Sequence, residues 1–185
     1  MPSNSRESLV GEVLQSKKGE YRITEELGSG GNGIVYEVKV EKAELEYLPE
    51  TCAIKVFCPS SELSDSERKE RFERFLNEID ITQRKEGVLN GIIPIWDYHI
   101  ANDAFSNPTW YLMPKAKPYR FMYSSLEKRI DELITLCEIV QNLHRNGIDH
   151  RDIKPGNLLY YKGHLVLSDL GLCWDESSDY HITGS

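Results

Sequence analysis

A short run in the second half of the sequence carries the side-chain types that phosphoryl transfer requires. It reads His150-Arg151-Asp152-Ile153-Lys154-Pro155-Gly156-Asn157. Asp152 can accept a proton from a hydroxyl nucleophile, and Lys154 can offset the charge of a transferred phosphoryl group. Asn157 offers an amide oxygen to a hard cation such as Mg²⁺. Twelve residues later, Asp169 follows an apolar stretch and can chelate such a cation between phosphates.

A glycine-rich stretch in the first half could cover phosphate groups. Gly28, Gly30 and Gly33 have the spacing Gly-x-Gly-x-x-Gly and lie between two runs with the alternation of β-strands. A dinucleotide-binding fold would place a helix after these glycines, whereas the β-rich run 34–40 follows here. Glycines between two strands let the backbone approach phosphates closely. A plain glycine-rich hairpin turn is the alternative interpretation.

A lysine on the next predicted strand is a second candidate phosphate ligand. Lys55 is flanked by apolar residues, and its ammonium group could hold phosphate oxygens. An ordinary solvated lysine would have the same signature. Glu78 is the expected partner because it lies three residues after Phe75, at the border of the apolar face of a predicted helix. Glu73 is the rival, and either glutamate could instead lie on the charged outer surface of that helix.

The elements that must position these residues change type near the middle of the chain. The first half predicts strands over residues 21–27, 34–40, 51–57, 92–100 and 109–113, and a helix over 64–85. Residues 1–18 are polar and are expected to form a flexible arm. A connector at 114–118 leads to a second helix, whose apolar stripe consists of Ile130, Leu133, Ile134, Cys137, Val140 and His144. A hairpin at Lys162-Gly163 follows, and the whole order predicts a two-lobed α+β fold.

The composition limits the classes of partner. The chain has 185 residues and a formal net charge of −8, from 22 Lys and Arg against 30 Asp and Glu. This acidic balance, without a basic block, argues against nucleic acid as a partner. No apolar run reaches the ~18–20 residues of a membrane span, and residues 1–18 lack the apolar core of a secretory signal. Four scattered cysteines favour free thiols in a reducing, cytoplasmic compartment.

Jointly, the motifs resemble those of the eukaryotic-type (Hanks-type) serine/threonine protein kinases. The glycine loop, Ala53-Ile54-Lys55, the run from His150 to Asn157 and Asp169-Leu170-Gly171 occur in that family's order, over roughly residues 21–185. Lys154-Pro155 is the family's serine/threonine signature. The resemblance implies a protein-kinase-like two-lobed fold. Its N-lobe would be a five-stranded antiparallel sheet with one helix at 19–113, followed by a hinge at 114–118 and an incomplete helical C-lobe at 119–185.

Each matching residue takes a role from this resemblance. The catalytic group would be Asp152 as base, with Lys154, Lys55 and Glu78. The magnesium ligands would be Asn157 and Asp169. The ATP phosphates would lie under Gly28, Gly30 and Gly33 and against Lys55. The adenine would contact Leu27, Val35, Ala53, Met113, Pro114, Ala116 and Leu159. ATP and Mg²⁺ are therefore the expected cofactors.

The end of the chain departs from the family pattern. Leu170 replaces the usual phenylalanine, an apolar exchange that should preserve packing. No Ala-Pro-Glu follows residues 183–185, so we expect the later C-lobe helices to be missing and the stripe on the second helix to be exposed, where a partner could cover it. Arg151, which precedes Asp152, indicates control by phosphorylation of the activation loop, because an arginine can hold a phosphate group. The candidate phosphorylation sites are Ser177, Ser178 and Thr183.

Two classes of function remain at this point. The leading hypothesis is a serine/threonine protein kinase, of which this chain is the N-terminal part, acting on protein Ser/Thr hydroxyls. The alternative is a catalytically incompetent ATP-binding or regulatory module. A small-molecule phosphotransferase of related fold fits less well, because the run Asp152-x-Lys154-Pro155 is of protein-kinase type.

Overall fold

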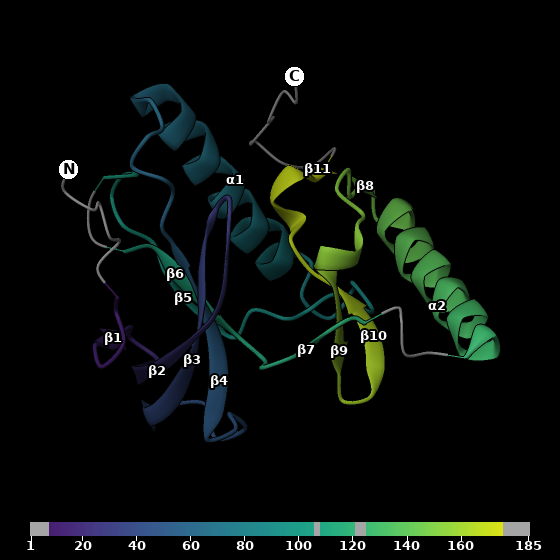
Figure 1. Cartoon of the computed structure of the whole chain (residues 1–185), viewed down its shortest axis with the longest axis horizontal. Coiled ribbons are helices and arrows are strands. Elements are labelled where there is room, and N and C mark those ends of the chain that lie inside the picture. The colour runs from purple at the N-terminus through teal and green to yellow at the C-terminus, as the bar shows by residue number, and fades with distance from the viewer. Residues whose placement is uncertain (1–7, 106–107, 121–124, 176–185) are drawn as a thin grey trace.

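The structure, a computed structural model, describes residues 8–105, 108–120 and 125–175. A curled sheet with helix α1 (Asp65–Arg84) forms one part of the molecule, and helix α2 (Leu126–Arg145) with small two- and three-stranded sheets forms the other (Figure 1). The two parts correspond to the two lobes predicted from the sequence. The candidate phosphorylation sites at 177, 178 and 183 lie outside the described residues.

The first lobe contains six antiparallel strands rather than the five predicted. Their order in the sheet is β1-β2-β3-β4-β6-β5. The strands are β1 (Val13–Gln15), β2 (Gly19–Gly30), β3 (Gly33–Ala43), β4 (Thr51–Phe57), β5 (Asp97–His99) and β6 (Trp110–Met113). The additional strand β1 lies within the predicted flexible arm 1–18, where Val13 pairs with Arg22. A three-residue strand is too short for an alternating pattern to reveal it. Residues 1–7 of the arm lie outside the described part.

The predicted strand 92–100 is shorter in the structure, because only Asp97–His99 pairs in the sheet. Pro94 lacks the N–H that a central strand needs. The residues before it turn toward the second lobe instead: Ile92 bridges Leu167, and the Ile93 N–H donates to the Leu167 carbonyl at 3.0 Å. This segment therefore ties the two lobes together.

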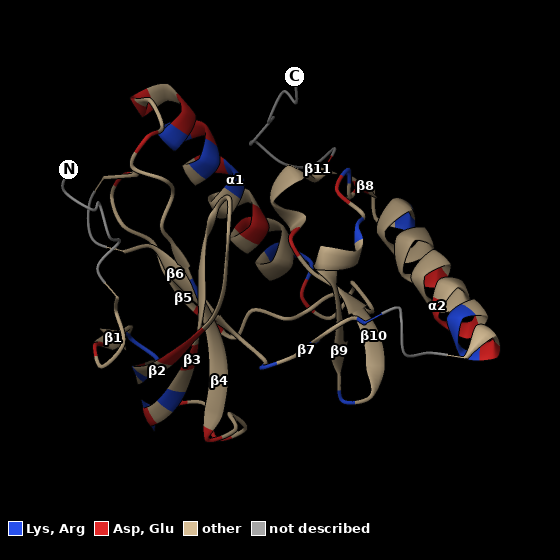
Figure 2. Ribbon diagram, viewed as in Figure 1, with Lys and Arg blue, Asp and Glu red and all other residues tan. Residues whose placement is uncertain are grey.

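Helix α1 packs against one side of the sheet, and its first turn begins at a capping residue. The Glu67 N–H donates to Ser64 Oγ at 3.3 Å, and the Ser64 N–H donates to Glu67 Oε2 at 2.9 Å, which completes a capping box worth about 1 kcal/mol. Phe72, Phe75 and Ile79 are buried against the sheet, as the predicted apolar face requires. Acidic and basic segments interleave along the outer surface of α1 (Figure 2).

The second lobe holds the remaining elements. They are β7 (Lys117–Pro118), β8 (Ile148–Asp149), β9 (Leu158–Tyr161), β10 (His164–Leu167) and β11 (Trp174–Asp175), with 3-10 turns at Pro155–Asn157 and Leu170–Leu172. Strands β10, β9 and β7 form one sheet, so part of the predicted connector 114–118 is paired with β9. The β9–β10 hairpin turns at Lys162 and Gly163, as predicted.

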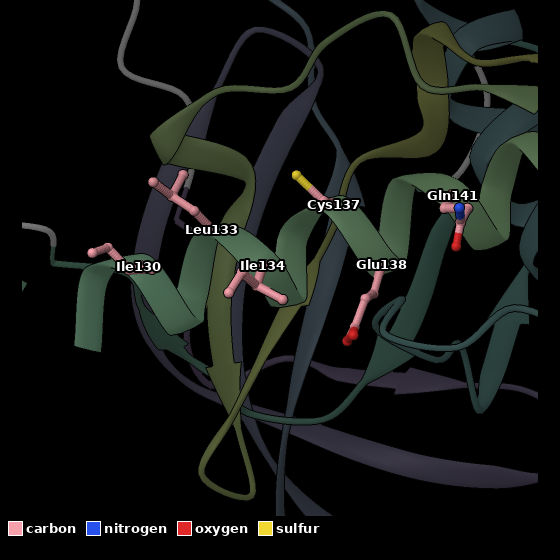
Figure 3. A pocket seen from close by; sticks show the side chains of 6 residues that line it. All are labelled: Ile130, Leu133, Ile134, Cys137, Glu138 and Gln141. Atoms are coloured by element: carbon pink, nitrogen blue, oxygen red, sulfur yellow. The ribbon is translucent and has the colours of Figure 1, made fainter. Parts of the chain in front are cut away.

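Helix α2 has two apolar faces, and only one of them is buried. Ile139 and Leu143 pack into the second lobe, and the Tyr119 hydroxyl donates to the buried Glu132 carboxylate at 2.9 Å. Ile130, Leu133 and Ile134, by contrast, are 50%, 55% and 53% exposed. They line a hollow of about 330 Å³ with Cys137, Glu138 and Gln141 (Figure 3). The predicted stripe is thus exposed, as expected. Neither this helix nor α1 is long and apolar enough to cross a membrane, within the described ranges.

Candidate active site

The glycine stretch forms the tip of the β2–β3 hairpin, with Gly30 opposite Gly33. A strand follows the glycines, so the helix of a dinucleotide-binding fold is excluded here. A Cβ on Gly33 would lie 2.2 Å from the Val56 carbonyl oxygen, so a glycine is required for β3 to approach β4. A Cβ on Gly28 or Gly30 would meet nothing within 4 Å. These two positions leave open space at the hairpin, which phosphate groups could fill.

A contact that the sequence pattern did not predict joins this hairpin to α1. The guanidinium group of Arg71 donates a hydrogen bond to the Gly31 carbonyl at the hairpin tip. Arg71 was given no role from the sequence, and only the three-dimensional arrangement brings it to the glycines.

Lys55 on β4 is the centre of a buried charge cluster. Its Nζ donates to Glu78 Oε2 at 2.7 Å and lies 3.8 Å from Asp169 Oδ1. Glu78, rather than Glu73, is therefore the partner on α1. Burial alone would lower the pKa of Lys55, but the carboxylates of Glu78 and Asp169 outweigh it and raise this pKa, so the ammonium group stays charged. Burial raises the pKa of Glu78, and Lys55 counteracts that rise.

Two aromatic rings flank the Lys55 ammonium group. Its Nζ lies 5.7 Å from the centroid of the Phe75 ring and 5.5 Å from that of Tyr111, a range in which cation–π attraction operates. Neither ring was assigned to the site from the sequence. Tyr111 lies directly opposite Lys55 in the β4–β6 register, so a correct alignment of these two strands would have revealed it.

The loop after β8 brings three of the predicted residues together. Lys154 Nζ donates to Asp152 Oδ2 at 2.6 Å, and Asn157 Nδ2 donates to the same oxygen at 3.0 Å and to the Asp152 carbonyl at 2.8 Å. Partial burial would raise the pKa of Asp152, but these two donors lower it below its usual value. Asp152 is therefore ionised at neutral pH and can accept a hydrogen bond from a hydroxyl group. The Asn157 amide nitrogen is engaged by Asp152, which leaves the amide oxygen as its ligand atom for a cation.

His150 joins this loop to the segment that precedes Asp169. The Asp152 N–H donates to His150 Nδ1 at 3.2 Å, and His150 Nε2 lies 3.2 Å from the Ser168 carbonyl oxygen. Burial lowers the pKa of His150, so the ring is neutral, and these partners fit a tautomer with the proton on Nε2. The imidazole thus fixes the distance between Asp152 and the segment that carries Asp169.

Asp169 adopts the left-handed conformation, with φ 66° and ψ 70°, at the end of β10. This turn directs its carboxylate toward Lys55. The turn is fixed on both sides: Leu170 is buried, as expected for the apolar exchange, and Asn77 Nδ2 of α1 donates to the Cys173 carbonyl at 3.1 Å. Helix α1 therefore positions Glu78 and supports the Asp169 turn at the same time.

Most of the residues predicted around an adenine share one apolar cluster between the lobes. Ala53 and Met113 are buried and directly opposite in the β4–β6 register. The partly buried members of the cluster include Val35, Ala116 and Leu159. Pro114 is also buried, whereas Leu27 is 42% exposed near the hairpin tip and is not a member.

The chemistry of this site fits a magnesium–nucleotide complex. Hard oxygen donors (Asn157, Asp169), a fixed ammonium group (Lys55) and open space at Gly28 and Gly30 come from four segments, namely the 3-10 turn Pro155–Asn157, the turn after β10, β4 and β2. No cluster of three or more His, Cys, Asp and Glu side chains suited to a metal occurs in the described residues. Two oxygen ligands are sufficient for Mg²⁺ when phosphates and water complete its octahedral shell.

Comparisons with known proteins point to one family. Residues 21–184 match the family model described as "Protein kinase domain". Serine/threonine-protein kinase PknD of Chlamydia caviae is 31% identical over 159 residues, which cover 75% of this chain and 15% of that protein. The probable serine/threonine-protein kinase pknA2 of Bifidobacterium longum is 28% identical over 171 residues, which cover 87% of this chain and 21% of that protein. Dual specificity protein kinase TTK of Mus musculus is 26% identical over 178 residues, which cover 91% of this chain and 19% of that protein. The chain thus spans about a fifth or less of the length of these relatives.

Proposed function

The chain belongs to the protein kinase domain family, and we propose that it transfers the γ-phosphoryl group of ATP to serine and threonine hydroxyls of proteins. The observation that carries this proposal is the position of the Lys55 ammonium group, 2.7 Å from Glu78 and 3.8 Å from Asp169. Three motifs far apart in the sequence meet at this one group. The same ammonium group would bind the α- and β-phosphates of ATP, with the glycine hairpin above them.

The proposed nucleotide site lies between the lobes. The adenine would lie between Val35 and Ala53 on one side and Leu159 on the other, and backbone groups of Pro114 and Ala116 would bond to its edge. Proline is acceptable there because only its carbonyl oxygen is used. Asn157 and Asp169 would hold Mg²⁺, which offsets the negative charge of the phosphates when it is bound.

Asp152 is the proposed catalytic base. Its ionised carboxylate would accept a hydrogen bond from the substrate hydroxyl, aim the oxygen at the γ-phosphorus and take the proton as the new P–O bond forms. Lys154 Nζ, which is 2.6 Å from Asp152 Oδ2, is close enough to turn toward the transferred phosphoryl group and neutralise its charge. The leaving group is ADP.

The proposed serine/threonine specificity rests on the pair Lys154-Pro155 and on the similarity to the serine/threonine-protein kinases PknD and pknA2. The proposed cellular location is a reducing compartment such as the cytoplasm, because all four cysteines are free thiols. They are Cys52, Cys58, Cys137 and Cys173.

The test is transfer of radioactive phosphate from [γ-³²P]ATP·Mg²⁺ to a general protein substrate such as casein, followed by acid hydrolysis and separation of the phosphoamino acids. We expect phosphoserine and phosphothreonine with the wild-type chain and no product with Lys55→Met. Phosphotyrosine as the main product would contradict the specificity. Tight ATP binding without any transfer would instead support the alternative, an ATP-binding module.

A further inference from the structure

The tip of the β2–β3 hairpin is held by a side chain from another element. The hairpin tip lies beside α1, and the Arg71 guanidinium group of this helix donates a hydrogen bond to the Gly31 carbonyl, 40 positions away in the sequence (Figure 1). A Cβ on Gly31 would lie 2.9 Å from Arg71 Nη1, so the guanidinium group is packed directly against the tip. Neither residue has a role in the phosphoryl transfer proposed above.

Arg71 lies on the same face of α1 as two residues of the charge cluster. Phe75 follows it by four positions and Glu78 by seven, and this spacing places the three side chains along one face of a helix. Phe75 and Glu78 are buried, and Glu78 accepts a hydrogen bond from Lys55 at 2.7 Å. One orientation of α1 therefore brings Arg71 to the hairpin tip and Glu78 to Lys55 at the same time.

The hairpin needs such a support because little else packs against its tip. Cβ atoms at Gly28 and Gly30 would meet nothing within 4 Å, so these positions offer no packing that would fix the backbone. Glycine also loses more conformational entropy than any other residue when it is ordered. A hydrogen bond from a charged guanidinium group is stronger than one between neutral groups. The contact from Arg71 can therefore hold the tip at one distance from α1.

We propose that Arg71 is a positioning residue, which fixes the glycine hairpin over the ATP phosphates and slows the release of the nucleotide. This inference rests on the proposed function, which places the phosphates between the hairpin and Lys55. Arg71 acts through the Gly31 carbonyl and touches neither the nucleotide nor the reacting atoms. A hairpin that is already held in its binding position loses less entropy when ATP binds, and it opens less often afterwards.

The first experiment measures the association and dissociation rates of a fluorescent ATP analogue with Mg²⁺ by stopped flow. For Arg71→Met we expect about fivefold faster dissociation, the effect of one hydrogen bond, and an association rate within about twofold of the wild type. Lys69→Met is the matched control, because Lys69 is exposed on the same helix and the change removes the same charge. Both of its rates should stay within about twofold of the wild type. Equal dissociation rates for Arg71→Met and the wild type overturn the proposal.

The second experiment tests whether Arg71 acts through the hairpin tip. Gly31 does not lie in the left-handed region, so alanine fits its backbone, but the added Cβ would displace the guanidinium group. Gly31→Ala should therefore speed dissociation of the same analogue about as much as Arg71→Met does. In the Arg71→Met background it should have less than about a twofold effect, because the contact is already lost. Equal effects in both backgrounds overturn the proposal.

The third experiment needs no nucleotide and separates this inference from the proposed function. Amide hydrogen exchange, followed by mass spectrometry, compares a peptide that covers residues 28–35 with one that covers the β9–β10 hairpin, residues 158–167. Arg71→Met should speed exchange in the first peptide about threefold or more and leave the second unchanged, because only the first hairpin contacts Arg71.

Two results of the exchange measurement contradict the proposal. Faster exchange in both peptides would show a general loss of stability, and unchanged exchange at 28–35 would show that Arg71 does not hold the tip. The second result, combined with faster release of the ATP analogue, would mean that Arg71 contacts the phosphates directly. If the wild-type chain binds no ATP, the proposed function fails, and the exchange rate at 28–35 alone decides the role of Arg71.

Discussion

The ammonium group of Lys55 on β4 and the carboxylate of Glu78 on α1 are 2.7 Å apart, although 23 positions separate them in the sequence. Both side chains are almost fully buried, at 13% and 5% exposure. Because a lone buried charge is far more costly than a paired one, this contact fixes α1 against the sheet and holds one ammonium group beside the Asp169 turn.

Removal of that ammonium group should weaken nucleotide binding. For Lys55→Met we expect at least tenfold weaker binding of an ATP analogue, because the phosphates lose their charged partner while Glu78 is left unpaired. Lys39→Met, on the exposed part of β3, is the matched control and should bind as the wild type does. Calorimetric titration gives both constants, and equal affinities for the two variants would contradict the assignment of Lys55.

Two glycines of the β2–β3 hairpin should differ in role: Gly33 is needed for stability, and Gly30 for ATP binding. Gly33→Ala places a Cβ 2.2 Å from the Val56 carbonyl, and we expect a loss of about 1–3 kcal/mol of unfolding free energy. Gly30→Ala meets no atom within 4 Å, so its stability should stay within about 0.5 kcal/mol of the wild type while ATP binding weakens. Urea denaturation and titration with an ATP analogue measure the two effects. A stable Gly33→Ala variant would refute the close approach of β3 to β4.

Asp169 should determine the magnesium dependence. Asp169→Asn keeps the shape of the side chain but removes one charged oxygen ligand, so about tenfold more Mg²⁺ should be needed for half-maximal ATP binding. Asp131→Asn, an exposed change on α2, should leave the Mg²⁺ titration unaltered. The same Mg²⁺ requirement in both variants would remove Asp169 from the proposed ligand set.

The stability of the chain should fall in acid partly because of His150. Burial lowers the pKa of this imidazole below its ordinary 6.5. Below about pH 6.5 the unfolded chain therefore binds a proton that the folded chain does not, and the stability that neutral His150 provides is lost as the pH falls further. His150→Asn removes this contribution, so the difference in melting temperature between wild type and variant should shrink from pH 8 to pH 5. A constant difference would show that the pKa of His150 is the same in the folded and in the unfolded chain, and would contradict the effect of burial.

The two apolar faces of α2 should respond differently to substitution. Leu143→Ala, at a fully buried position, should cost about 2–5 kcal/mol of unfolding free energy. Ile134→Ala, at a position that is 53% exposed, should cost less than about 1 kcal/mol. Chemical denaturation of both variants compares the two values, and similar costs would contradict the orientation of the helix.

Much of the site could be predicted from local patterns. The spacing of Glu78 from Phe75 placed the glutamate at the edge of a buried helical face, and the structure places it against Lys55. The strand 51–57 is found with the predicted bounds, because an apolar run that ends in a proline-containing loop leaves little freedom for its limits.

The features that the sequence did not reveal depend on contacts between distant segments. Strand β1 exists because Val13–Gln15 finds a partner in β2, not because three residues carry a pattern. Tyr111 joins the site through its register with β4, and Arg71 through a backbone carbonyl that no side-chain pattern marks. On α2 the apolar stripe is exposed as predicted, but the second apolar face, through which Ile139 and Leu143 pack into the second lobe, was not identified from the sequence.

The most direct test of the central claim compares Asp152→Asn with Asp131→Asn for phosphate transfer from ATP·Mg²⁺ to protein, with ATP affinity measured in parallel. Asn cannot take the proton of the hydroxyl nucleophile, so Asp152→Asn should lower the transfer rate by about 10²–10⁴-fold while ATP affinity changes little. Asp131→Asn should match the wild type in both measurements. Equal transfer rates for Asp152→Asn and the wild type would contradict the account, because the residue at its centre would then have no part in the chemistry.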